Sequence, residues 1–243
     1  MIDCTPKNLK AEWHLTYRCD LACVNCNRLC FLPPQTPDMT LADAEEFCWQ
    51  ADELDWHPRI VIIGGEPTLH PDFFGFLGIA NQLSLGNVEL YSNEYSEKAK
   101  RCVEKVRAKS LADVVPWTKK SDGGVVHDTC DIFLAPRDFG IPNREPCSTH
   151  SGPGICGISV DHDGYSCCCM GGMIDATFQL GVRTKQLADL FNSEFAARQT
   201  RALCDCCGQG LGIDAKKIVR SQVICGAIMS PAWQGAVDRI KDQ

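Results

Sequence analysis

The chain has 243 residues and carries a formal net charge of −7 at pH 7. This excess of acidic residues argues against a nucleic-acid-binding surface, because phosphate contacts need clustered cations. The start of the sequence shows no signal peptide, and no apolar run approaches the roughly 18 residues of a membrane span. We therefore expect a cytoplasmic protein with neither a nucleic acid nor a membrane as its partner.

Cysteine is the unusual residue of this composition, with 17 copies. Three interpretations compete: the disulfides of a secreted protein, structural zinc sites, and iron–sulfur clusters in a reducing compartment. The odd count and the missing signal peptide argue against disulfides. Cys23-x-x-Cys26 and Cys204-x-x-Cys207 have the spacing of paired zinc knuckles, and iron–sulfur clusters also take cysteine thiolates. The arrangement of the cysteines must decide between the last two.

The predicted elements alternate between strands and helices over the first half of the chain. Apolar runs predict strands at Glu12 to Arg18, Arg59 to Ile63, Asn87 to Tyr91, Val114 to Trp117 and Asp131 to Leu134. Helical spacing predicts helices after Thr40, over Phe73 to Leu83 and after Ser96. This alternation predicts βαβ units and a parallel sheet, whose strands carry functional residues at their carboxyl ends.

Three motifs follow such strand ends, so we expect them to meet at one edge of the sheet. They begin at Cys19, at Gly64 and at Ser92. Farther along the chain, Ile158 to Asp161 and Tyr165 to Cys167 predict a β-hairpin with an Asp-Gly turn, followed by a helix from Thr184. The last residues, from Gly226, predict a short terminal helix.

The first motif, Cys19-x3-Cys23-x2-Cys26, places three thiols within eight residues after a strand. A [4Fe–4S] cluster normally takes four cysteine ligands, so three would leave one iron open to a small molecule. A structural zinc ion prefers a closed set of four ligands, and Cys30 could supply the fourth.

Over about residues 12 to 140, the sequence resembles the radical S-adenosylmethionine (SAM) superfamily. The resemblance rests on the three-cysteine motif after the first strand and on a GGEP motif, Gly64-Gly65-Glu66-Pro67, after the second. It implies a partial (β/α) barrel, a [4Fe–4S] cluster on the three cysteines, and SAM whose amino group lies at the GGEP edge. Ser92-Asn93 stands where the family often has a polar pair near the ribose or the substrate. One residue departs from the pattern, since Asn25 replaces the usual aromatic residue before the third cysteine.

The chemistry that the resemblance implies is reductive cleavage of SAM. An electron from a donor such as flavodoxin or ferredoxin reaches the cluster and yields methionine and a 5′-deoxyadenosyl radical. This radical abstracts hydrogen from a substrate, while the protein supplies positioning, exclusion of water and the cluster potential.

A second group of cysteines resembles the auxiliary-cluster modules called SPASM and twitch. A complete set of four ligands for an auxiliary [4Fe–4S] cluster would be Cys156, Cys167, Cys204 and Cys207. Cys168 or Cys169 could replace Cys167, and Cys206 competes with its neighbours. Spare cysteines leave room for a second auxiliary cluster, but the regular SPASM spacing is missing, so we expect one.

The predicted fold class is therefore α/β, with a partial barrel over residues 1–145 and a hairpin-plus-helix iron–sulfur module over residues 146–243. The predicted function is oxidation (dehydrogenation) of a small polar substrate, assisted by the auxiliary cluster. A radical SAM epimerase or peptide-modifying enzyme is the alternative within the class. A non-catalytic zinc or iron–sulfur binding protein is the alternative outside it.

Overall fold

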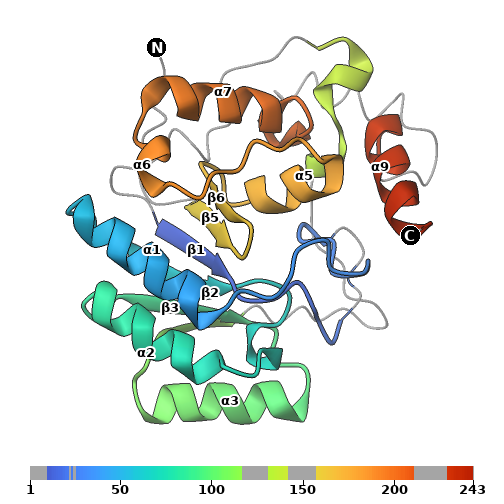
Figure 1. Cartoon of the computed structure of the whole chain (residues 1–243). Helices are drawn as coiled ribbons and strands as arrows, with labels where there is room; N and C mark the ends of the chain where they lie inside the picture. Colours follow the sequence, from blue (N-terminus) through green and yellow to red (C-terminus); the bar gives the residue numbers. More distant parts are fainter. Residues whose placement is uncertain are drawn as a thin grey trace.

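A computed structural model describes residues 10–21, 23, 26–116, 131–141, 157–210 and 229–242. The described residues contain one six-stranded sheet with the strand order β4-β3-β2-β1-β5-β6 (Figure 1). The strands are β1 (Lys10–His14), β2 (Arg59–Ile63), β3 (Val88–Ser92), β4 (Asp113–Pro116), β5 (Ile158–Asp161) and β6 (Gly164–Ser166). Neighbouring strands are parallel except in the antiparallel hairpin of β5 and β6.

The helices of the described residues flank this sheet and its hairpin (Figure 1). They are α1 (Leu41–Glu53), α2 (Phe73–Leu83), α3 (Glu97–Ala108), α5 (Gly171–Phe178), α6 (Leu187–Leu190), α7 (Ser193–Cys204) and α9 (Pro231–Lys241). Side-chain caps define several of their starts: Thr40 forms a capping box at α1, and Ser96 accepts from the backbone of α3.

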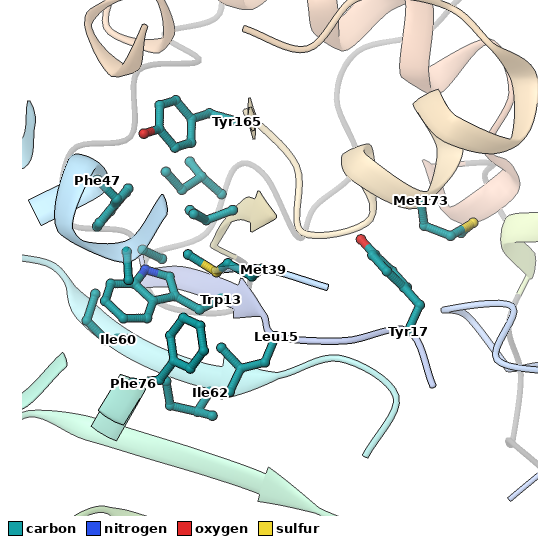
Figure 2. Close-up of a cluster of buried hydrophobic side chains, with 14 of the residues drawn as sticks. Trp13, Leu15, Tyr17, Met39, Phe47, Ile60, Ile62, Phe76, Tyr165 and Met173 are labelled. Atoms are coloured by element: carbon teal, nitrogen blue, oxygen red, sulfur yellow. The ribbon is translucent and has the colours of Figure 1, made fainter. Parts of the chain in front are cut away.

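Side-chain alternation along β1 gives the sheet two chemically different faces. Trp13 points to the apolar face, where its ring lies 5.6 Å from that of Phe47 in α1 and 6.4 Å from that of Phe76 in α2 (Figure 2). The register pairs Trp13 with Ile62 of β2, which is also fully buried. Lys10 and Glu12, which alternate with these apolar residues, point to the opposite face, here called the polar face.

The β5–β6 hairpin extends the sheet at the edge of β1. β5 pairs in parallel with β1, so that Ala11 lies opposite Ile158 and Trp13 opposite Val160. On the polar face, α5 packs on β5, and the backbone of Gly172 donates to Ser159 Oγ at 3.1 Å. The hairpin is therefore built directly onto the strand that leads to the first cysteine motif.

The α/β class and most predicted elements are confirmed, and three predictions need correction. The strand expected at Glu12 to Arg18 is instead Lys10–His14. The expected strand at Asp131 to Leu134 is instead a short 3-10 helix, η2 (Asp131–Phe133). Its Phe133 side chain packs against α9, where the ring centres of Phe133 and Trp233 lie 5.0 Å apart. The Phe133 carbonyl accepts from the Ser230 N–H. The helix expected from Thr184 is divided, because Asn192 caps the start of α7.

The sequence pattern also missed α5, whose glycine-rich start has no side-chain cap. The partial barrel stays a prediction, because the described strands form an open sheet with β4 and β6 at its edges. The predicted division at residues 145 and 146 falls between 142 and 156, outside the described residues. No helix in the described part of the chain combines the length and apolarity that crossing a bilayer requires.

The close approach of β5 to β1 requires Gly157. A Cβ atom added there would lie 2.1 Å from the Lys10 carbonyl oxygen. We expect Gly157→Ala to lower the free energy of unfolding by about 1–3 kcal/mol, as overpacking does. The control is Gly78→Ala on α2, where an added Cβ has no neighbour within 4 Å. That change should raise stability by up to about 1 kcal/mol. Denaturant unfolding under reducing conditions measures both, and equal stability of the two variants would contradict the prediction.

Candidate active site at the carboxyl ends of the parallel strands

A pocket of about 220 Å³ lies against the polar face of the sheet. Its wall includes the cysteine loop and the carboxyl ends of β2 and β3. The loop contributes Cys19, Cys23, Cys26 and Cys30, and the strand ends contribute Gly64, Gly65, Ser92 and Asn93. The structure thus brings the three sequence motifs to one pocket, as their positions after parallel strands predict. In the described ranges, no three Cys, His, Asp or Glu side chains are arranged to hold a single metal ion.

The glycine pair fixes the cysteine loop to the end of β2. An added Cβ would lie 2.3 Å from the Thr16 carbonyl oxygen at Gly64 and 2.2 Å from the Arg18 carbonyl oxygen at Gly65. The Gly65 N–H donates to Thr16 O at 2.7 Å, and the Glu66 N–H donates to Arg18 O at 2.9 Å. The sequence interpretation gave these glycines a close approach to a ligand. The structure adds a close approach to the backbone that precedes Cys19.

Glu66 is fully buried, and both of its carboxylate oxygens are engaged. Oε1 accepts from the N–H and the hydroxyl of Thr68, and Oε2 accepts from the Asn93 N–H at 2.8 Å. The Ser92 hydroxyl lies within hydrogen-bonding distance of both oxygens. Burial raises the pKa of Glu66 although these hydrogen bonds oppose the rise. Glu66 therefore joins the ends of β2 and β3, and it is not among the side chains that line the pocket.

Two thiols of the loop interact directly. A hydrogen bond between Cys26 and Cys30 lowers the pKa of Cys26 to about 6 and raises the pKa of Cys30. Burial raises the pKa of Cys19 to about 12. Cys30 is thus close to the three-cysteine motif, which keeps it available as a fourth ligand.

Charged side chains of the polar face form a second part of the pocket wall. Glu12 of β1 accepts from buried Arg28 at 3.0 Å, and burial raises the pKa of Glu12. Lys10 donates to Glu89 of β3 at 2.9 Å, and Glu89 also pairs with Arg59 at 2.5 Å. Sequence reasoning missed these residues, although the alternation of β1 puts Lys10 and Glu12 on one face and could have indicated them.

The second cysteine group gathers where β6, α5 and α7 meet. The Cys167 thiol is buried and lies 3.0 Å from Thr200 Oγ1 of α7. A hydrogen bond from Cys169 lowers the pKa of Cys168, but burial and the nearby Cys207 and Cys167 raise it to about 11. Cys206 is fully buried. Burial raises its pKa, and the charge of Arg137 in the Pro136–Phe139 turn opposes the rise.

Two cysteines of the predicted auxiliary set, Cys204 and Cys207, are adjacent at the end of α7, where the Cys207 N–H donates to the Cys204 carbonyl at 3.2 Å. Cys156 lies outside the described residues, as do the spare cysteines Cys147 and Cys225 and the unusual Asn25. The ligand roles of all these cysteines stay predictions.

Comparison with known proteins yields a likeness of fold. The chain matches no protein-family model and no curated relative. It resembles the crystal structure of BtrN in complex with AdoMet (SAM) and 2-DOIA, with a TM-score of 0.54 and 15% identity over 85% of this chain and 94% of BtrN. A second BtrN structure, in an open conformation, gives 0.52 and 15% over 93% and 96%. The chain therefore shares the fold of BtrN.

The buried hydrogen bonds of Glu66 lead to a testable prediction about stability. In Glu66→Gln, the side-chain NH2 must face at least one of the backbone donors at Thr68 and Asn93. We expect the free energy of unfolding to fall by about 1–3 kcal/mol, the cost of unsatisfied buried groups. Chemical denaturation of the metal-free protein measures it, and Glu97→Gln at an exposed helix position should change little. Unchanged stability with loss of SAM binding would instead indicate that Glu66 contacts the ligand directly.

Proposed function

We propose that this chain is a radical SAM enzyme that holds a [4Fe–4S] cluster on Cys19, Cys23 and Cys26 and abstracts hydrogen from a small polar substrate. The observation that carries the proposal is the single pocket shared by the cysteine loop, the glycine edge and Ser92-Asn93. Thiolates are the ligands that such clusters take, so the donor set fits. A flavodoxin or ferredoxin is the expected electron donor.

The residues around the pocket have separable tasks in this proposal. When bound, the cluster and SAM supply a 5′-deoxyadenosyl radical able to break an unactivated C–H bond. Gly64 and Gly65 hold the base of the loop against β2 and leave backbone groups at the pocket wall for the methionyl end of SAM. The hydrogen bonds between Ser92 and Glu66 hold this edge in place. Such fixed positioning is the contribution a protein makes when the cofactor carries the chemistry.

The charged wall supports a polar substrate. Lys10 and Glu12 line the pocket, and each has a counter-ion in the described residues, Glu89 for Lys10 and Arg28 for Glu12. Hydroxyl or amine groups of a substrate can hydrogen-bond to these side chains without requiring a net charge. The small-molecule ligand named with AdoMet in the BtrN structure favours the same size class over a peptide.

An auxiliary [4Fe–4S] cluster at the second cysteine group would serve oxidation. With four protein ligands it would have no open iron, and it could take an electron from a substrate radical. Arg28 lies between the described cysteines of the two groups: it lines the pocket together with Cys26, and it donates to the sulfur of Met170, the residue after Cys169. An auxiliary cluster at the second group would therefore lie close to the polar face, on which the substrate pocket lies. This arrangement favours dehydrogenation over epimerisation.

The thiol positions refine the predicted auxiliary ligands. The Cys167 thiol lies 3.0 Å from Thr200 Oγ1 of α7, and burial together with the nearby Cys207 and Cys167 raises the pKa of Cys168. We infer that Cys168 takes the place predicted for Cys167, alongside Cys156, Cys204 and Cys207.

The main test of the cluster uses single cysteine variants of the first motif. Anaerobically reconstituted Cys19→Ser, Cys23→Ser and Cys26→Ser should lose formation of 5′-deoxyadenosine from SAM by at least about 100-fold, since each removes a ligand. Cys30→Ser should retain it, and Cys102→Ser on α3 is the remote control. Loss of activity in Cys30→Ser together with bound zinc would favour the alternative of a structural zinc site.

Iron content tests the auxiliary cluster independently. The reconstituted chain should bind about eight iron atoms, and Cys204→Ser or Cys207→Ser should reduce this to about four. Cys168→Ser should behave like these variants, and Cys167→Ser should keep the full iron content. About four iron atoms in the unaltered chain would remove the auxiliary cluster. Product analysis in heavy water then separates oxidation from epimerisation, because an epimerised product carries solvent deuterium at carbon.

A further inference from the structure

Asn93 links the glycine edge to the first cysteine of the loop. Its backbone N–H donates to Glu66 Oε2 at 2.8 Å. Its carboxamide Nδ2 lies 3.5 Å from Cys19 Sγ and 2.8 Å from Asp20 Oδ1. The side chain thus continues a hydrogen-bonded path that begins at Thr68 and runs through Glu66 to the thiol of Cys19.

The orientation of this carboxamide is determined by its partners. Its oxygen accepts from the backbone N–H of Tyr95 at 2.8 Å. A backbone N–H can only donate, so the oxygen must face Tyr95 and the NH2 group must face Cys19 and Asp20. The contact with Cys19 is therefore an N–H···S hydrogen bond in which the Asn93 carboxamide donates to the sulfur.

A donor placed on a ligand sulfur changes the energetics of electron uptake. Hydrogen bonds to the sulfurs and the surrounding charge are among the factors that set the reduction potential of iron–sulfur clusters. One-electron reduction adds a negative charge to the cluster and its sulfurs, and a hydrogen-bond donor stabilises the more negative state more strongly. An N–H···S bond at Cys19 therefore favours reduction.

Building on the proposed function, we propose that Asn93 sets the reduction potential of the cluster held by Cys19 through the hydrogen bond from its Nδ2 to Cys19 Sγ. The electron comes from an external donor protein, and no proton is transferred in this step. Asn93 acts through Cys19 and is a positioning residue. This role differs from the contact with the ribose or the substrate that its sequence position suggests.

The experiment measures the midpoint potential of the SAM-binding cluster by electron paramagnetic resonance during a redox titration without SAM. The signal of this cluster is identified beforehand as the one that SAM perturbs. Asn93→Leu keeps the number and branching of the side chain's heavy atoms and removes the donor, so its midpoint potential should shift to more negative values than that of the unaltered chain. Asn93→Val removes the donor from a smaller side chain, should shift in the same direction, and carries the test if Asn93→Leu does not fold.

The matched control is Thr68→Val. It removes a hydroxyl that donates to Glu66 at the far end of the same path and makes no contact with Cys19. Its potential should equal that of the unaltered chain. Assembled clusters with unchanged potentials in the Asn93 variants would overturn the inference. Loss of the cluster from both Asn93 variants while Thr68→Val keeps it would also overturn it, because Asn93 would then be required for assembly. Absence of any [4Fe–4S] signal in the unaltered chain would instead refute the proposed function.

Discussion

The candidate site depends on the contact between two stretches of backbone, at Gly64-Gly65 and at Thr16 to Arg18. At each glycine the neighbouring carbonyl oxygen occupies the space of a Cβ atom, so no other residue fits without moving the chain. Two backbone hydrogen bonds close this contact. Cys19 follows it directly, and the loop that carries the thiols therefore starts from a position fixed by the end of β2.

The buried charged groups around this contact are stabilised because each has a hydrogen-bonding partner. Glu66 has a donor at each oxygen, and Glu12 has the guanidinium of Arg28. Buried ion pairs contribute little net stability, because desolvation offsets their attraction, but removal of one partner is costly. The large aromatic side chains of Trp13, Phe47 and Phe76 pack on the other face, between the sheet and the helices α1 and α2 (Figure 2).

Elements with a strong local signal could be predicted from the sequence. The run Arg59–Ile63 and the helix Phe73–Leu83 have their predicted bounds, because β-branched content and helical spacing agree with burial there. The apolar residues after Asp131 gave a false strand, since their burial comes from α9, nearly 100 residues away. No local pattern contains that information.

The residues of the candidate site also differ in whether the sequence could predict them. The cysteine spacing and the glycine pair are contiguous motifs, so sequence alone could bring them together. Arg28 and Glu89 enter the site only through strand register and loop folding, and sequence reasoning passed over them. The hydrogen bonds of Glu66 with Ser92 and Asn93 likewise depend on the distance between β2 and β3, which only the folded chain specifies.

The parallel pairing of β5 with β1 has a consequence for motion. The five residues of β1 lead at their carboxyl end to the loop of the first cysteine group, and at their amino end Lys10 lies against Gly157 at the start of the hairpin. A strand rises about 3.3 Å per residue and does not stretch, so it acts as a fixed spacer between them. Opening of the hairpin as a rigid body would break the pairing of β5 with β1. A reactant must therefore enter the pocket while these two strands stay paired.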